Sequence, residues 1–84
     1  MYNINWKPKA YRQLNKIDKT DRKKIIIAVD SLASFSTVKN IKRLINHQFN
    51  YRLRIGNYRV LFDVDTVVRI IDIQEVKKRD DNTY

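Results

Sequence analysis

Residues 51–60 read "YRLRIGNYRV", two alternating segments joined by Gly56–Asn57. Alternation of apolar and basic residues predicts β-strands with one buried face. A two-residue loop with glycine first is typical of a type II′ hairpin turn, which fixes the register and sets Arg54 directly opposite Arg59. Because side chains alternate across a strand, the apolar residues of the two strands should share the face that meets the core: Tyr51, Leu53, Ile55, Tyr58, Val60, Phe62 and Val64. The opposite face then carries three arginines, Arg52, Arg54 and Arg59.

The N-terminal half predicts one short strand and two helices. Residues 2–6 alternate between apolar and polar side chains, as in a half-buried strand. Pro8 can begin a helix because its missing N–H has no partner in the first turn. Apolar residues at helical spacing then predict helices over residues 8–17 and 21–34, with Thr20 as the N-cap of the second.

The C-terminal half predicts three strands, over residues 51–55, 58–64 and 67–76, with a second turn at Asp65–Thr66. The connection before them is expected to be irregular, apart from a partial helical turn that carries Val38, Ile41, Leu44 and Ile45. The fold class is therefore α+β with the order β-α-α-β-β-β. Two N-terminal helices should pack on one face of a small, mostly antiparallel sheet.

Charge dominates the composition, with 18 Lys and Arg against 9 Asp and Glu and a net charge of +9. Residues 1–49 hold 11 of the basic and 3 of the acidic side chains, a balance of +8. A polyanion, most simply nucleic acid, is the expected partner. The alternatives are a solvated basic surface or docking to an acidic protein.

The chain is expected to be a single soluble domain over residues 1–84. It has no cysteine, so disulfides and thiolate metal sites are excluded. Its longest apolar run, Ile25–Val29, is too short to span a bilayer, and its first residues do not resemble a signal peptide. We therefore expect a cytoplasmic protein without a membrane partner.

The arginine face has two interpretations. Like charges directly opposite on a sheet are destabilising by up to about 1 kcal/mol per pair. We therefore expect the opposed Arg54 and Arg59 to have a functional role. Arginine matches phosphate oxygens bidentately, and three on one rigid patch would form a phosphate clamp. The alternative is a solvated basic face on which Asp72 neutralises Arg59.

The segments "YRLRIGNYRVLFDVD" and "VVRIIDIQEVKKRDDNTY" resemble the RelE family of bacterial toxins, within the RelE/ParE superfamily. The family's layout of a strand, two helices and a three-stranded antiparallel unit covers essentially the whole chain. The resemblance implies a ribosome-dependent endoribonuclease that cuts messenger RNA in the decoding site without a metal or cofactor. It also implies a cognate antitoxin as partner, with an acidic or amphipathic segment.

In that family the 2′-hydroxyl attacks the adjacent phosphate and leaves a 2′,3′-cyclic phosphate and a 5′-hydroxyl. The resemblance implies that Arg59 holds the scissile phosphate and that Arg52 and Arg54 stabilise its developing charge. In-line phosphoryl transfer depends on such charge stabilisation and positioning. Because arginine keeps its proton, the identity of the general base stays open.

For the C-terminal segment "VKKRDDNTY", the resemblance implies that Lys78 or Arg79 lies near the leaving 5′-oxygen. It also implies that Tyr84 stacks on a splayed base. His47, the single histidine, is interpreted as a surface residue. The remaining basic residues would contact messenger or ribosomal RNA: Lys7, Lys9, Arg12, Lys16, Lys23, Lys24, Lys42, Arg43 and Lys77. The scattered acidic residues predict no metal site.

Two other functions compete with this hypothesis. One is a non-catalytic toxin like the ParE branch, which shares the fold and poisons DNA gyrase. The other is a plain basic RNA-binding module. A translation assay beside a gyrase supercoiling assay would separate the three.

Overall fold

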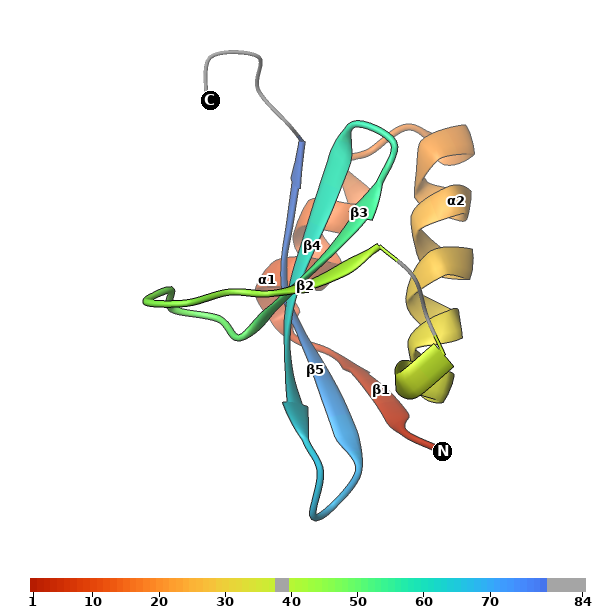
Figure 1. Cartoon of the computed structure of the whole chain (residues 1–84). Helices are drawn as coiled ribbons and strands as arrows, with labels where there is room; N and C mark the ends of the chain where they lie inside the picture. The colour runs from red at the N-terminus through yellow and green to blue at the C-terminus, as the bar shows by residue number, and fades with distance from the viewer. Residues whose placement is uncertain (38–39, 79–84) are drawn as a thin grey trace.

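The computed structural model describes residues 1–37 and 40–78 (Figure 1). Its elements run as β1 (Asn3–Trp6), α1 (Pro8–Asn15), α2 (Lys19–Asp30), the 3-10 helix η1 (Ser31–Thr37), β2 (Ile41–Arg43), β3 (Tyr51–Ile55), β4 (Tyr58–Asp65) and β5 (Ile70–Lys78). The five strands form one sheet in the order β1-β5-β4-β3-β2. Within the described residues, β1 pairs with β5 in parallel and the other neighbours are antiparallel. This confirms the predicted α+β class.

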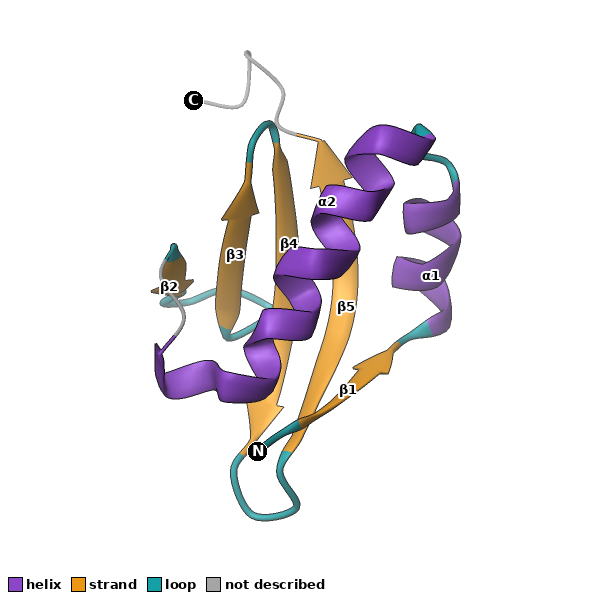
Figure 2. Ribbon diagram, turned by 90° about the vertical axis from the view of Figure 1, so that its right-hand side faces the viewer, coloured by secondary structure: helices purple, strands orange, loops and turns teal. Residues whose placement is uncertain are grey.

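Both helices lie on one side of the sheet, as predicted (Figure 2). Pro8 is the first residue of α1, where its missing N–H costs nothing. The predicted cap of α2 is wrong by two residues, because Asp18 rather than Thr20 precedes the helix and accepts the Asp21 N–H at 3.4 Å. An aspartate and a threonine are both good caps, so the local sequence does not choose between them. None of the described helices is long and apolar enough to cross a membrane.

The core fills the space between the helices and the sheet. Its fully buried side chains include Phe62, Ile25 and Leu32, each of which contributes about 1.5–3 kcal/mol on burial. The Tyr51 ring stacks on the Phe62 ring with centroids 5.5 Å apart. The apolar residues predicted to face the core from the β3–β4 hairpin all lie in or against this cluster: Tyr51, Leu53, Ile55, Tyr58, Val60, Phe62 and Val64.

The β3–β4 hairpin has the predicted turn and register. Gly56 has a positive φ of 53°, whereas Asn57 does not, which matches a type II′ rather than a type I′ turn. Arg54 is paired with Arg59 across the strands. The three arginines therefore share the face away from the helices.

The β4–β5 turn is longer than predicted. Asp65 still belongs to β4 and pairs with Ile70, so the turn holds four residues and β5 begins three residues later than expected. The Asp65 carboxylate accepts the N–H groups of Val67 at 2.9 Å and Val68 at 3.1 Å. An aspartate at the first position of a turn commonly caps the amides that follow, and here it holds a wider loop.

The segment before β3 forms an edge strand and not the predicted partial helical turn. Ile41 packs against the core as expected, but Ile45 is 84% exposed. Asn40 and Asn46 have positive φ angles of 67° and 56°, which interrupt a helical path on both sides of β2. Pairing with β3 also satisfies backbone groups that an open sheet edge would leave unpaired. Val38 lies outside the described residues.

Candidate nucleic-acid interface

The face of the sheet away from the helices carries a groove of about 460 Å³. The register of the strands brings its residues together, because Arg59 is paired with Lys77 on β5 and Arg52 is paired with Leu61 on β4. Its walls come from β3, β4, β5 and the loop between β2 and β3. We call it the basic groove, and it is lined by Leu44, His47, Arg52, Arg59, Leu61, Lys77 and Lys78. No acidic side chain is among these residues.

A second hollow of about 220 Å³ adjoins the basic groove at the β2 edge, with Arg52 lining both. Lys42 is paired with Arg52 across β2 and β3, and Arg54 and Asn40 also line this hollow. The predicted arginine face is thus part of a longer basic strip. This strip runs across the sheet from β5 to β2.

The Arg52 side chain is half-buried in this strip. Its Nε is buried and has no hydrogen-bond partner within residues 1–37 and 40–78. A buried donor left unsatisfied costs about 1–3 kcal/mol. An acceptor from outside the chain, such as a phosphate oxygen, would remove that cost. The arrangement suits an anionic ligand.

Asp72 does not neutralise Arg59, which corrects the alternative interpretation of the arginine face. Asp72 is paired with Asp63, and its carboxylate accepts the Asn5 side-chain amide at 2.8 Å. The position opposite Arg59 belongs instead to Lys77. A register shift at Leu61–Phe62 moves β5 by one residue between the two regions, as a β-bulge does. The outer face is consequently divided into an acidic end and a basic end.

Glu75, one of the scattered acidic residues that predict no metal site, lies beside the basic groove next to Lys77. It is only 7% exposed, and its two carboxylate oxygens accept the ammonium groups of Lys9 on α1 and Lys77 on β5, the latter at 3.3 Å. Burial by itself raises the pKa of a carboxyl group. Here the hydrogen bonds and charges of Lys9 and Lys77 outweigh burial and hold the pKa of Glu75 below its ordinary value. The ion pair with Glu75 in turn holds the Lys77 side chain beside the groove.

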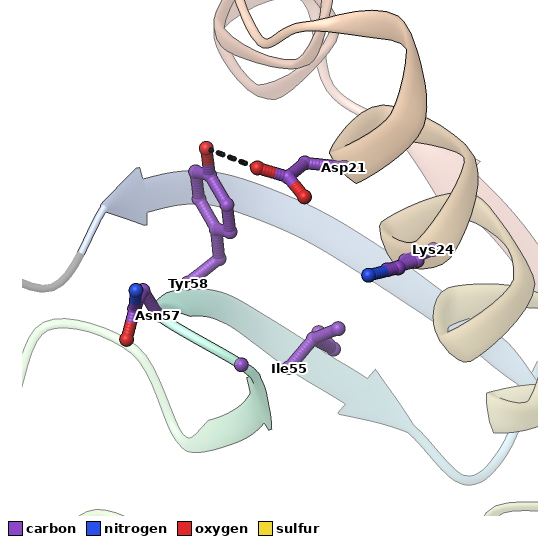
Figure 3. Close-up of a pocket in the computed structure, with 6 residues that line it drawn as sticks. Asp21, Lys24, Ile55, Asn57 and Tyr58 are labelled. Carbon is purple, nitrogen blue, oxygen red and sulfur yellow. Dashed lines mark hydrogen bonds between the residues drawn. The ribbon is translucent and has the colours of Figure 1, made fainter.

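A hydrogen bond on the helix side holds the end of the β3–β4 hairpin. Figure 3 shows the Tyr58 hydroxyl donating to the Asp21 carboxylate of α2 at 3.2 Å. Desolvation of the Tyr58 ring raises its pKa, and the hydrogen bond and charge of Asp21 raise it further. The two residues line a hollow of about 240 Å³ with Lys24, Ile55, Gly56 and Asn57. This contact holds β4, the strand that carries Arg59, against α2.

The other predicted RNA contacts do not line the basic groove. Lys42 and Arg43 lie on β2 at the sheet edge. Lys9 is engaged with Glu75. Arg79 and Tyr84 lie outside the described residues. The remaining predicted contacts belong to the helical layer on the opposite side of the sheet: Lys7, Arg12, Lys16, Lys23 and Lys24.

His47 is exposed, as predicted, but it also lines the basic groove. Its place depends on the backbone of the β2–β3 loop, and no local sequence pattern signals it. Among the described residues, no cluster of His, Cys, Asp and Glu could hold a metal ion.

Comparison with known proteins identifies the family. A family model described as the ParE toxin of type II toxin–antitoxin systems, parDE, matches residues 4–82. None of the curated protein sequences matches. The toxin–antitoxin complex RelBE2 from Mycobacterium tuberculosis has a TM-score of 0.79 at 21% identity, over 93% of this chain and 98% of that chain.

Two further solved structures have the same fold. The isolated E. coli RelE toxin has a TM-score of 0.80 at 15% identity, over 95% of this chain and 86% of that chain. The YoeB dimer from Staphylococcus aureus has a TM-score of 0.69 at 22% identity, over 94% and 98% of the two chains. The chain thus belongs to the ParE toxin family of type II toxin–antitoxin systems, in the RelE/ParE superfamily, and has the fold of RelE toxins.

Proposed function

We propose that this toxin is a metal-independent endoribonuclease that cuts messenger RNA on the ribosome and so inhibits translation. The observation that carries the proposal is the basic groove, where Arg52 has a buried Nε without a hydrogen-bond partner among the described residues and Arg59 lies opposite Lys77. A surface that served only solubility would gain from an acid at one of these positions. A single-stranded RNA backbone supplies the acceptors that this groove requires.

The chemistry follows from the residue types. Arg59 holds the scissile phosphate, and Arg52 and Arg54 stabilise the charge that develops on its oxygens during attack by the 2′-hydroxyl. Lys78, or Arg79 beyond the described residues, lies near the leaving 5′-oxygen. Tyr84 stacks on a splayed base and orients its 2′-hydroxyl. Lysine and arginine supply charge and position, and the ribosome completes the site.

An antitoxin is the second partner. The M. tuberculosis relative is a toxin–antitoxin complex, and a net charge of +9 favours an acidic or amphipathic antitoxin segment here. Such a segment would neutralise the basic groove, and both proteins would work in the cytoplasm. Because the charges on this face are accessible to solvent, the complex should weaken with salt.

A second candidate is a gyrase-inhibiting toxin, which the match to the ParE family model favours. The basic groove argues against it, because a toxin that acts by binding a protein needs no cluster of phosphate-binding arginines. A plain RNA-binding module is a third possibility, and it would bind RNA without cutting it.

The deciding experiment compares the toxin in a reconstituted translation reaction and in a gyrase supercoiling assay. Wild-type toxin should stop translation and leave gyrase active, and Arg59→Ala should slow messenger cleavage at least about 100-fold. Arg69→Asn is the matched control, since Arg69 is exposed in the β4–β5 turn and asparagine tolerates its φ of 57°. If the toxin inhibits gyrase and leaves translation unaffected, it is a gyrase-inhibiting toxin and the proposal is wrong.

A further inference from the structure

The β2–β3 loop holds His47 beside the groove. The loop extends from the sheet on the side opposite α2 (Figure 1). The Leu44 N–H donates to the Asn50 carbonyl at 2.8 Å, and the Asn50 N–H donates to the Asp63 carboxylate at 2.8 Å. The first bond closes the loop and the second anchors it to β4. The two ends of the loop are thereby held, and His47, between them, lines the groove with Arg52.

A hydrogen bond indicates which ring nitrogen of His47 accepts and which donates. Its Nδ1 accepts the backbone N–H of Phe49 at 3.1 Å. A backbone amide donates, so Nδ1 is the acceptor in this contact and the ring N–H that it leaves is on Nε2. The Phe49 ring lies 6.2 Å from the His47 ring and tilted by 47°. The polar atom left for a ligand is thus a donor, Nε2–H.

We propose that His47 donates this Nε2–H to an anionic oxygen of a single-stranded RNA backbone bound in the basic groove. It is a binding and positioning residue, and not the general base, because Nε2 has no free lone pair while Nδ1 accepts from Phe49. The inference rests on the proposed function and adds to it an imidazole N–H donor in a groove whose other polar side chains are those of arginine and lysine.

Two isosteric substitutions separate the two ring nitrogens. Asparagine in His47→Asn places its amide oxygen near the position of Nδ1, which keeps the bond to Phe49 and leaves no donor at the position of Nε2. Glutamine in His47→Gln places an amide nitrogen near the position of Nε2, which restores the donor. A 2′-O-methyl RNA hexamer is the probe, because it lacks the attacking hydroxyl and stays intact.

We expect His47→Asn to bind the hexamer about five- to tenfold more weakly than wild type and His47→Gln to stay within about twofold of it. Urea unfolding of both variants should match that of the wild type. Equal affinity of His47→Asn and wild type would overturn the inference. Binding by His47→Gln as weak as that of His47→Asn would also overturn it, as would a wild type that does not bind the hexamer.

Nitrogen-15 NMR gives an independent readout, because the chain has one histidine and its ring signals need no assignment. The free protein should have a protonated Nε2 and a deprotonated Nδ1, and the hexamer should shift Nε2 more than Nδ1. The opposite tautomer would contradict the inference. A wild type that binds through Nε2 but never cuts messenger RNA would keep the inference and reject the proposed function.

Discussion

Arg54 and Arg59 are paired across two strands, an arrangement in which their charges repel each other. Their stems extend from a rigid hairpin, so neither guanidinium can move far from the other without losing its place on the basic strip. Repulsion in the free protein becomes attraction once a phosphate lies between them. The stability of the free toxin and its affinity for RNA should therefore respond in opposite directions to loss of one charge.

Arg54→Gln tests this opposition, because glutamine keeps part of the stem and removes the charge. We expect the free energy of unfolding to rise by up to about 1 kcal/mol while hexamer affinity falls about tenfold. Urea unfolding and a binding titration measure the two effects. A variant with lower stability and undiminished affinity would show that the pair is structural.

Tyr84 is a second test at this scale. Stacking on an unpaired base contributes about 1–3 kcal/mol, and part of it should appear in the rate if the stack forms only in the reactive geometry. We expect Tyr84→Phe to keep most of the cleavage rate and Tyr84→Ala to lose about tenfold or more. Single-turnover cleavage on programmed ribosomes compares them. A Phe variant as slow as the Ala variant would assign a role to the hydroxyl.

At the scale of elements, α1 is tied to β5 by polar contacts as well as by the core. The side-chain oxygen of Gln13 accepts the Val76 N–H at 2.7 Å, and Lys9 bonds to Glu75 on the same strand. These contacts hold the stretch of β5 beyond its pairing with β1, which ends at Ile73. The basic groove depends on this stretch, because Lys77 belongs to it.

Glu75→Gln should therefore destabilise the fold in a pH-dependent way. The folded-state pKa of Glu75 is lowered, so its ion pairs stabilise the fold above the ordinary pKa of a carboxyl group, and this stability is lost as pH falls through the lowered value. We expect a loss of about 1–2 kcal/mol at neutral pH, reduced from a fully buried pair because both lysines are solvent-accessible.

Urea unfolding between neutral and acidic pH measures the difference between Glu75→Gln and wild type, which should shrink as pH falls. Asp30→Asn is the control, since Asp30 is an exposed carboxylate at the end of α2. A constant difference across the pH range would show that Glu75 acts through packing and not through its charge.

At the scale of the molecule, positive charge lies on two sides. The basic groove occupies the outer face of the sheet, and exposed lysines such as Lys23 and Lys24 occupy α2 on the other side. If the groove takes messenger RNA, the helical layer is free to contact ribosomal RNA. The excess positive charge of residues 1–49 would then help the toxin bind the ribosome, and the β3–β4 hairpin would carry the residues that cleave messenger RNA.

The double variant Lys23→Glu/Lys24→Glu separates docking from reaction. We expect kcat/KM for cleavage on ribosomes to fall about tenfold, because these exposed charges would increase the association rate, while the single-turnover rate at saturating toxin stays at the wild-type value. The loss should diminish at high salt. An equal fall in both rates would place these lysines in the reaction itself.

The sequence predicts the groove only in part, for a physical reason. Alternation and Gly56 determine the hairpin locally, and both its register and its two faces are confirmed. Lys77 lies opposite Arg59 because of a bulge between β4 and β5, and the alternation of side chains does not signal where a bulge occurs. The edge strand β2 and the position of His47 depend on positive φ angles at Asn40 and Asn46, which the pattern of apolar residues does not encode.

The chemistry of the RNA ends that the toxin produces tests the proposed function most directly. Purified wild-type toxin is added to ribosomes programmed with a labelled messenger, and the fragments are analysed for their termini. We expect a cut in the decoding site that leaves a 2′,3′-cyclic phosphate and a 5′-hydroxyl, with no need for a divalent ion beyond that of the ribosome. Arg59→Ala should give these products at least about 100-fold more slowly. An intact messenger, or ends with a 3′-hydroxyl and a 5′-phosphate, would contradict the proposed function.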